Sequence, residues 1–378
     1  MSANLYSKLI HDSSYKLVQL APDLLETLEN TSQSEIKFKA VNNEKSDVVL
    51  CSKNKTWLIK EKHHSNTVML LREFVATGQQ TLDEKSLFGM PQPINDLLAF
   101  SRTTSEYETR PAKGLLNIDH LPIYNGDVGF PTEPAKLKFK TLDDVLDNSP
   151  ASELESFTRW NLLGGCIVNG FPCLLSAEFL SNALHVTLMS VMAESLDLDS
   201  LTIKDTFEAV NKDMSEGSNP YTKKVIETVL RKYGTKLDKG EKEDKENWKL
   251  DRQEISRWYG IRALRKYATK PSLPMEEFLV KWKSTFPPFS PFNIEMKMLG
   301  GWYFQPIARN IQYVSKDTLP TDIKERFKML FRLQSQWDLE NIIPFVDELN
   351  TKGLKPDIFV MKYARKKRVG KRYIVSSR

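Results

Sequence analysis

The stretch DIKERFKMLFRLQSQWDLENIIPFVDEL, residues 322–349, carries the pattern that decides the predicted fold. Residues 322–337 place five large apolar side chains on one stripe of a helix with about 3.6 residues per turn, namely Ile323, Phe327, Leu330, Phe331 and Trp337. Asp338 is suited to cap the N-terminus of a second helix. Pro344 lies inside that helix and should kink or delay it. The stretch therefore predicts two consecutive helices joined by a short turn.

A third helix and a strand pair complete the pattern. Pro356 suits the first turn of a helix, and the positive end of the helix dipole would stabilise the Asp357 carboxylate in that turn. We expect this helix to run through ARKK, residues 364–367. The segment KKRVGKRYIVSS then indicates a two-stranded wing with Gly370 at its turn. Three helices followed by a β-hairpin are typical of a winged helix, so residues 317–378 are predicted to form a C-terminal basic winged helix.

The same cycle of helices followed by a strand pair recurs in the two preceding segments without a repeat of sequence. Residues 252–316 hold helical patterns and end in the strand-like GGWYFQPIARNIQYV. Residues 177–251 hold three helical patterns, and Pro220 is suited to the first turn of the last one. The charged end of this segment, 235–251, is either a solvated linker or the wing that the cycle needs. We predict winged helices at 177–251 and 252–316.

The region 111–176 shows a shorter version of the cycle. A helical pattern covers 151–163, and CIVNGFPCLL follows at 166–175. Within it, Asn169-Gly170 supplies the positive φ angles of a tight type I′ turn between two strands. We predict a winged-helix-like domain over 111–176.

The first hundred residues favour strands. Apolar residues alternate with polar ones over 36–40, then VVLC, TWLIK and TVMLL follow, with SKNK at 52–55 as a hairpin turn. So few short strands leave a sheet with open edges, which is closed by later chain or completed by another protein. Pro91 breaks the pattern. We predict a β-rich partner-binding barrel domain at 1–105. The predicted fold class is α+β, with an N-terminal partial barrel completed by partner subunits and then tandem winged helices.

Composition bounds the class of protein. The 378 residues, 40% hydrophobic and 27% charged, are typical of a soluble globular chain with two to four domains. Cys51, Cys166 and Cys173 form neither an even set nor a CxxC motif, which favours a reducing compartment and no structural zinc. Neither a secretion signal nor a run of about 18 apolar residues occurs, so we expect no membrane partner.

Concentrated catalytic motifs are absent from the sequence. It contains no GxxxxGK[ST], GxGxxG, HExxH or GxSxG. His63-His64 lies in a charged, turn-like stretch, and adjacent histidines are poorly spaced for one metal ion. Asp143-Asp144 and Glu276-Glu277 lie at predicted helix starts, where carboxylates stabilise the dipole. We therefore predict no catalytic residues, no metal site, no cofactor and no enzymatic activity.

The net charge of +5 is concentrated at the C-terminal end, where eight basic residues and no acidic one fall in 362–378. On a helical wheel Lys355 shares an arc of about 100° with three later cations, and the wing supplies more. The predicted DNA-binding residues here are Lys362, Arg365, Lys366, Lys367, Arg368, Lys371, Arg372 and Arg378. Such contacts to phosphates provide affinity without base specificity. The alternative is a solvated basic tail.

A second basic set lies on the predicted helix that opens 252–316, where cations alternate with Trp258, Tyr259 and Tyr267. First helices of such domains usually supply core residues, so only one face is assigned to nucleic acid. That face carries Arg262, Arg265 and Lys266.

Several segments together resemble one protein family. They are VVLCSKNKTWLIK (48–60), EYETRP (106–111), TLDDVLDNSPAS (141–152), RKYGTKLDKGE (231–241), the block 319–349 and the tail KRYIVSSR. In these the chain resembles the Dcc subunit of the alternative replication-factor-C-like clamp loader that acts in sister-chromatid cohesion, in its fungal form. The block 319–349, with ERF, LFRL, QSQW and IIPFVDEL, is the most specific.

The resemblance implies a set of partners and a nuclear location. The N-terminal sheet would pair with a small cohesion subunit and with the C-terminal tail of the large clamp-loader subunit, forming a joint β-barrel. The chain would dock on the catalytic region of DNA polymerase epsilon, bind single- or double-stranded DNA, and assist loading or unloading of the sliding clamp, PCNA. The ATPase chemistry would belong to other subunits.

Two other functions remain open at this point. One is a cullin-like scaffold, in which winged helices make only protein contacts and the basic tail binds an acidic partner. The other is a stand-alone transcription regulator with sequence-selective DNA binding and a stable N-terminal domain.

Overall fold

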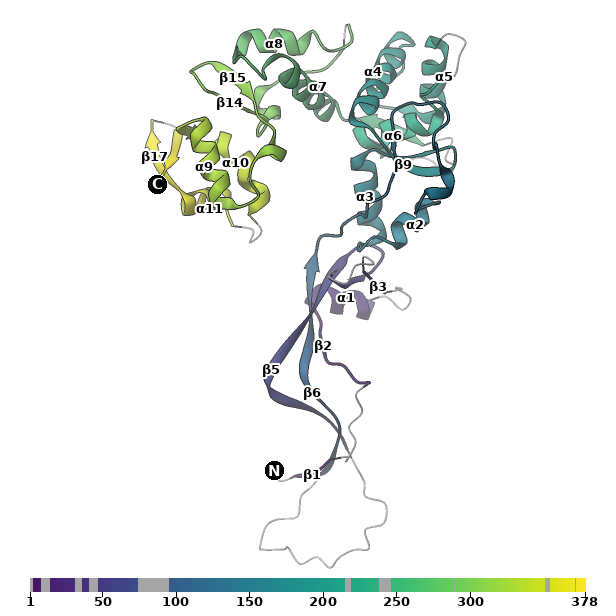
Figure 1. Ribbon diagram of the computed structural model, residues 1–378, viewed down its shortest axis with the longest axis vertical. Helices are drawn as coiled ribbons and strands as arrows, with labels where there is room; N and C mark the ends of the chain where they lie inside the picture. The colour runs from purple at the N-terminus through teal and green to yellow at the C-terminus, as the bar shows by residue number, and fades with distance from the viewer. Residues whose placement is uncertain are drawn as a thin grey trace, which may run out of the picture. The chain divides into compact units, whose positions relative to one another are not determined.

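The computed structural model describes residues 3–7, 14–30, 36–40, 47–73, 95–214, 219–237, 246–288, 290–350, 354–370 and 372–378. The chain divides after Ser176 into two compact units, residues 1–176 and 177–378. Figure 1 labels their helices and strands in chain order. Both units mix helices with small sheets, which confirms the predicted α+β class.

A large sheet opens the first unit. Its strands are β1 (Ala3–Ser7), β2 (Val18–Gln19), β3 (Lys37–Lys39), β4 (Val49–Cys51), β5 (Thr56–Glu73) and β6 (Asn95–Ala112). The order is β1-β6-β5-β4-β3, with β2 pairing parallel to β6. Among the described strands, β1 and β3 end this order and the sheet does not close into a barrel. In Figure 1, β5 and β6 run as a long two-stranded ribbon beyond helix α1 (Pro22–Asn30).

Two predictions for this sheet were wrong in detail. TWLIK and TVMLL belong to one continuous strand, β5, so His63-His64 lies within a strand instead of a turn. Its pairing with β6 continues on both sides of an irregularity between His63 and Val68, which keeps the backbone extended through a polar stretch. The sheet also continues through β6 to Ala112, past residue 105. The predicted turn at 52–55 is confirmed, because Ser52 N–H donates to the Lys55 carbonyl at 3.0 Å.

The core beneath this sheet is small. Ala21, Leu24, Leu50 and Trp57 form one buried cluster, with Ile36 and Ile59 packed against it. The Trp57 indole N–H donates to Asp23 Oδ1 at 3.1 Å, which joins β5 to α1. Among the described residues, this cluster lies at the α1 end of a sheet whose strands β5 and β6 are 18 residues long.

The remainder of the first unit is a separate α+β layer. Its elements are β7 (Ile123–Tyr124), η2 (Pro134–Lys136), α2 (Leu142–Asp147), α3 (Glu153–Leu163), β8 (Gly165–Val168) and β9 (Phe171–Leu175), with sheet order β7-β9-β8. Asn169 (φ 52°) and Gly170 (φ 88°) form the predicted turn between β8 and β9. The Asp144 carboxylate completes a capping box with Thr141, which confirms a capping role for this acidic pair.

One carboxylate joins the large sheet to this layer. Glu155 on α3 accepts from Thr56 Oγ1 on β5, from Ser152 Oγ at 2.7 Å and from Gly114 N–H at 3.2 Å. Ser152 N–H in turn donates to Thr56 Oγ1 at 2.8 Å. Partial burial raises the pKa of Glu155, but these hydrogen bonds outweigh it, so the pKa lies below its ordinary value.

This carboxylate makes the first unit sensitive to acid. A carboxylate whose pKa is lowered by folding contributes stability above its unfolded pKa, and that contribution is lost as pH falls through the folded pKa. We expect Glu155→Gln to lower the melting temperature at neutral pH, and the difference from the unmodified chain to shrink below about pH 4. Thermal unfolding from neutral to acid pH measures this. A difference that stays constant with pH would contradict it.

The second unit begins with a first module of three helices and a sheet. Its elements are α4 (Ala177–Ala193), β10 (Leu201–Thr202), α5 (Ile203–Asp213), α6 (Lys223–Tyr233), β11 (Gly234–Leu237) and β12 (Asn247–Leu250). β11 and β12 pair antiparallel, so the charged segment after α6 forms a hairpin and not a linker. Its tip, 238–245, lies outside the described residues. The prediction for Pro220 was wrong, because α6 begins at Lys223 and Thr222 caps it.

A second module follows with α7 (Arg252–Tyr267), β13 (Leu273–Pro274), α8 (Met275–Lys283), η4 (Met296–Leu299), β14 (Tyr303–Phe304) and β15 (Asn310–Tyr313). Its sheet order is β13-β15-β14. Helix α7 approaches α8 and η4 closely at Gly260, where an added Cβ atom would lie 2.7 Å from the Trp282 ring and 2.6 Å from Leu299. Glu276 and Glu277 occupy the first turn of α8, as predicted.

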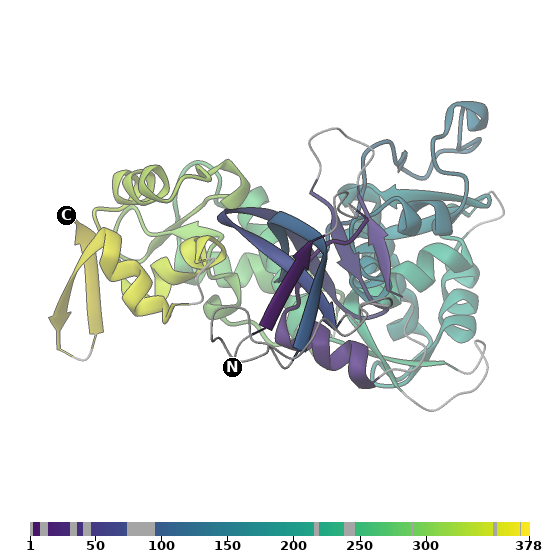
Figure 2. The same ribbon diagram turned by 90° about the horizontal axis from the view of Figure 1, so that it is seen from below.

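The third module contains η5 (Lys316–Thr318), α9 (Ile323–Leu333), β16 (Gln336–Asp338), α10 (Leu339–Val346), η6 (Asp347–Leu349), α11 (Pro356–Tyr363), β17 (Ala364–Val369) and β18 (Arg372–Ser377). Its sheet order is β16-β18-β17. Figure 2 shows the β17–β18 hairpin as a yellow ribbon extending away from neighbouring helices.

Two predictions for the third module were wrong. Trp337 lies on β16, not on the preceding helix; it pairs with Val375 and its indole N–H donates to the Leu330 carbonyl at 3.1 Å. The last helix ends at Tyr363, and ARKK forms the start of β17. Residues 364–369 pair with β18, which satisfies their backbone hydrogen-bonding groups. The strand therefore forms in place of a further turn of helix. Asp338 is at the N-cap of α10, but its side chain makes no capping hydrogen bond.

Candidate nucleic-acid interface

The β17–β18 hairpin carries most of the predicted cations, and its register assigns them to two faces. Residues directly opposite in an antiparallel pair share a face. The pairs Ala364–Ser377 and Lys366–Val375 include the buried Ala364 and Val375, so this face is directed toward the core. The pairs Arg365–Ser376 and Lys367–Ile374 therefore point outward.

Three predicted cations lie on the outward face. Arg365 and Lys367 on β17 and Arg372 on β18 are all exposed. The Arg372 guanidinium is 78% exposed, and its Nη1 lies 3.6 Å from the Asp338 carboxylate on β16. Exposed ion pairs contribute little, so Asp338 offsets only part of this charge. The outward face of the hairpin therefore groups three exposed cations on one side of the third module.

The other two hairpin cations occupy the inward face. Lys366 is only 19% exposed, its Nζ lies 3.8 Å from Asp357 Oδ2, and it stands 4.1 Å above the Tyr373 ring. These contacts hold Lys366 within the module. Arg368 is exposed, and its Nε donates to the Gly370 carbonyl at 3.3 Å. The predicted helical arc of Lys355, Lys362, Arg365 and Lys366 does not form, because α11 ends at Tyr363.

The remaining predicted cations of this end lie apart from the outward face. Lys362 is exposed on α11. Arg378 Nη2 donates to the Met361 carbonyl at 2.6 Å, which ties the end of the chain to α11. Lys371 lies outside the described residues. Gly370 at the tip has φ 60°, the left-handed conformation that the predicted turn required.

The second predicted set lies on α7, where Arg262, Arg265 and Lys266 are all exposed. Arg265 is 5.8 Å from both the Trp302 and Tyr313 ring centres, and its Nε donates to Tyr313 Oη at 2.8 Å. Arg262 and Lys266 likewise lie over aromatic rings of their own helix. These contacts give the face a structural role whether or not it meets nucleic acid.

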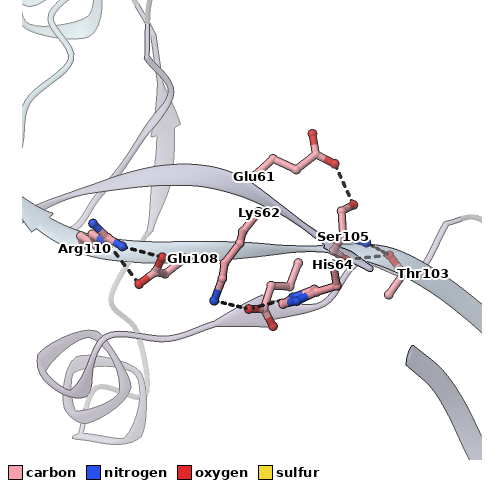
Figure 3. Close-up of polar contacts among 8 residues, drawn as sticks. Glu61, Lys62, His64, Thr103, Ser105, Glu108 and Arg110 are labelled. Atoms are coloured by element: carbon pink, nitrogen blue, oxygen red, sulfur yellow. Dashed lines mark hydrogen bonds and ion pairs between the residues drawn. The ribbon is translucent and has the colours of Figure 1, made fainter. Parts of the chain in front are cut away.

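A charged face of the N-terminal sheet is a further surface feature (Figure 3). Lys62 Nζ and His64 Nε2 lie 3.4 and 3.0 Å from the same oxygen of Glu106. The Arg110 guanidinium donates twice to Glu108, at 3.1 and 2.9 Å, which lowers the pKa of this carboxyl and raises that of Arg110. The contacts to Glu106 cross from β5 to β6 and the Arg110–Glu108 pair lies within β6, so little net charge remains there for a polyanion.

The same sheet exposes large apolar side chains. Leu5 is 53% exposed, Met69 45%, Leu71 44% and Phe38 71%. Exposed apolar residues next to unpaired strand edges are typical of a surface that another chain covers. Patterns in the sequence indicated the open edges, but not which side chains would remain uncovered.

One basic cluster escaped the sequence prediction. Lys324, Lys328 and Arg332 recur every four residues on α9 and are exposed, near Arg378. This spacing places the three cations on one face of the helix. The same spacing is visible in the sequence and could have predicted the cluster.

Two further features are absent from the described ranges. There, no three His, Cys, Asp or Glu side chains are grouped to hold a metal ion. Across those same ranges, no helix combines the length and apolarity needed to cross a membrane.

Comparison with known proteins shows which family the chain matches. The family model described as "Sister chromatid cohesion protein Dcc1" matches residues 15–346. The chain is 50% identical over 383 residues to Sister chromatid cohesion protein DCC1 of Saccharomyces cerevisiae, covering 100% of both chains. It is 26% identical to the Homo sapiens protein of that name, over 88% of this chain and 80% of the human one. For the Dictyostelium discoideum protein named as a probable DCC1, identity is 21% over 94% and 91%.

Proposed function

This chain belongs to the Dcc1 family of sister chromatid cohesion proteins, and from that premise we propose that it is a non-catalytic, nuclear subunit of an alternative clamp loader. In this role it binds partner subunits and the catalytic region of DNA polymerase epsilon. It contacts DNA and assists loading or unloading of PCNA. The full-length match at 50% identity to the yeast protein supports the family role in cohesion and fits a fungal source.

The partner-binding part of the proposal concerns the N-terminal sheet. We assign its completion into a barrel to the C-terminal tail of the large clamp-loader subunit and to a small cohesion subunit. The open edges at β1 and β3 support this, as do the exposed Phe38, Met69 and Leu71. Strand addition to an open edge gains main-chain hydrogen bonds and covers apolar side chains.

The DNA-binding part concerns the modules that follow. We propose that the three modules of the second unit are winged helices and that 111–176 is related to them. In each of the three modules, one short strand lies between helices and joins a three-stranded sheet whose other two strands form a hairpin after the last helix. The observation that carries DNA binding is the outward cationic face of β17–β18, with exposed Arg365, Lys367 and Arg372.

A cullin-like scaffold that makes only protein contacts is the second candidate. The aromatic contacts of Arg265 and the internal contacts of Lys366 favour it, because they give these cations roles without nucleic acid. The two candidates differ in whether the intact chain binds random duplex DNA.

We expect Arg365→Ala with Lys367→Ala to weaken binding to all duplex sequences alike. Each phosphate contact contributes about −0.9 to the slope of log affinity against log salt, so the slope should become shallower by about two units. Fluorescence anisotropy with a random duplex at several salt concentrations measures both quantities. Folding should survive, because exposed substitutions usually change stability by under about 0.5 kcal/mol.

Lys324→Ala with Arg332→Ala is the matched control, since it removes two exposed cations from the same module. We expect this pair to leave the slope close to that of the unmodified chain. An unchanged slope in the hairpin pair would move DNA contact off the hairpin, and equal losses in both pairs would show that the contact is not confined to it. An unmodified chain that binds no DNA would favour the scaffold.

A further inference from the structure

A pocket of about 370 Å³ lies at the base of the third module, away from the hairpin tip. Helix α9 forms one wall, and Tyr363 at the end of α11 and Ser377 at the end of β18 form the other. Six residues of β17 separate this base from the tip, a length of about 20 Å. The tip of the hairpin therefore lies away from the pocket, whereas Arg365, which pairs with Ser376, lies at the pocket end of β17.

The rim of the pocket is strongly basic. Lys324, Lys328, Arg332 and Arg378 line it, and none of its eight lining residues is acidic. Lys328 lies 3.5 Å from Glu325, an ion pair in which both side chains are more than half exposed. Among the residues that the structure describes, Lys324 and Arg332 form no ion pair. At least two cations on one wall are thus available to an external anion.

The floor of the pocket is aromatic, but its rings are stacked on one another. Phe327 lies 5.4 Å from Tyr363 with an interplanar angle of 18°, and 6.2 Å from Phe331 with an angle of 27°. A nucleobase platform needs a free ring face, because bases bind by stacking. Phe327 already uses its faces for neighbouring rings, so the floor suits an aliphatic side chain better than a base.

The spacing of the cations suits an extended peptide. Lys324, Lys328 and Arg332 are four residues apart on α9, which places them about 6 Å apart along the axis. Alternate side chains of an extended chain are about 6.6 Å apart on one face. Acidic residues two positions before and two positions after a large apolar residue share its face and lie about 13 Å apart, which matches the separation of about 12 Å between Lys324 and Arg332. The apolar residue between them on that face then reaches the floor.

We propose that this pocket binds an acidic, extended peptide segment of a partner protein that inserts one large aliphatic side chain between α9 and α11. The cations provide charge complementarity at the rim, and Phe327, Phe331 and Tyr363 provide apolar burial. A cavity of this size holds one or two side chains. None of the cations that line the pocket belongs to the proposed DNA-binding face, so this inference and the DNA proposal can each fail alone.

The test uses the full chain and a fluorescein-labelled peptide of about nine residues, in which glutamates alternate with serines around one central leucine. We expect Lys324→Glu with Arg332→Glu to weaken peptide binding about tenfold or more, because two attractions become repulsions. Replacing the central leucine of the peptide by serine should cost a similar factor, since a buried leucine contributes strongly. Circular dichroism melting checks that each variant folds.

Lys367→Glu with Arg372→Glu is the matched control for charge, because it reverses two cations of the same module that lie nearer the hairpin tip. We expect it to change peptide affinity by no more than about twofold while it abolishes duplex binding. Equal losses in both charge-reversed chains would overturn the proposal in favour of unspecific attraction. Insensitivity to the leucine, or no binding at all, would also overturn it. The proposal would also be overturned if Lys324→Glu with Arg332→Glu weakened the binding of an oligothymidylate but not the binding of the peptide.

Discussion

Replacing Arg326 with methionine is expected to destabilise the third module by about 3–5 kcal/mol. Arg326 is 3% exposed, and its guanidinium donates to the carbonyls of Pro320 at 2.6 Å and Phe345 at 3.0 Å. It also approaches the Leu319 carbonyl at 3.5 Å and pairs with Glu348. Methionine keeps much of the side-chain volume but leaves these buried acceptors without donors. That loss is a large fraction of the stability of a typical domain.

Hydrogen–deuterium exchange of the α9 amides measures this locally. Because a loss of about 3 kcal/mol raises the population of open states about a hundredfold, exchange in 323–333 should accelerate by that factor. Arg332→Met is the control, since Arg332 is an exposed arginine on the same helix. Its effect should stay below about 0.5 kcal/mol. Similar exchange in the two variants would show that the buried hydrogen bonds contribute little.

A fragment of residues 1–112 is expected not to fold alone. Within the described residues, the buried cluster beside α1 has four members, Ala21, Leu24, Leu50 and Trp57, while β5 and β6 each extend over 18 residues. A sheet with so small a core and with exposed apolar side chains buries too little surface to offset the conformational entropy of ordering the chain. We expect aggregation, or a monomer without a cooperative melting transition.

Residues 177–378 provide the comparison, because this unit has its own extensive core. We expect this second fragment to be monomeric and to melt cooperatively. Size-exclusion chromatography and calorimetry of the two fragments measure the difference. A monodisperse 1–112 with a cooperative transition would refute the view that partners complete this sheet.

Local patterns predicted much of the fold. The stripe of Ile323, Phe327 and Leu330 indicated α9, and Asn169-Gly170 indicated the β8–β9 turn, because helix period and turn conformation depend on residues close in sequence. The continuity of β5 was missed, since the residues around His63 are polar and are held extended by β6, about forty positions later. Such pairing leaves no local signal.

The candidate nucleic-acid interface was also predicted only in part from the sequence. Sequence alone located the basic residues at the C-terminal end, because charge follows directly from residue type. It assigned Arg365 and Lys366 to one helical face, whereas the register of β17 places them on opposite faces of a strand. It also missed the α9 pocket, whose lining comes from three elements.

The amino-acid sequence by itself determined the α+β class, the amphipathic helices, the tight turns and the location of positive charge, because each depends on side chains within a few positions. Tertiary structure alone decided where α11 ends, since the backbone of 364–369 finds its hydrogen-bond partners in β18. It also decided which cations remain available to a ligand. Lys366 is held by Asp357 and Tyr373, and Arg265 by Trp302 and Tyr313, while Arg365, Lys367 and Lys324 face solvent. The physical reason is that availability depends on contacts between residues distant in sequence, which only the packed chain brings together.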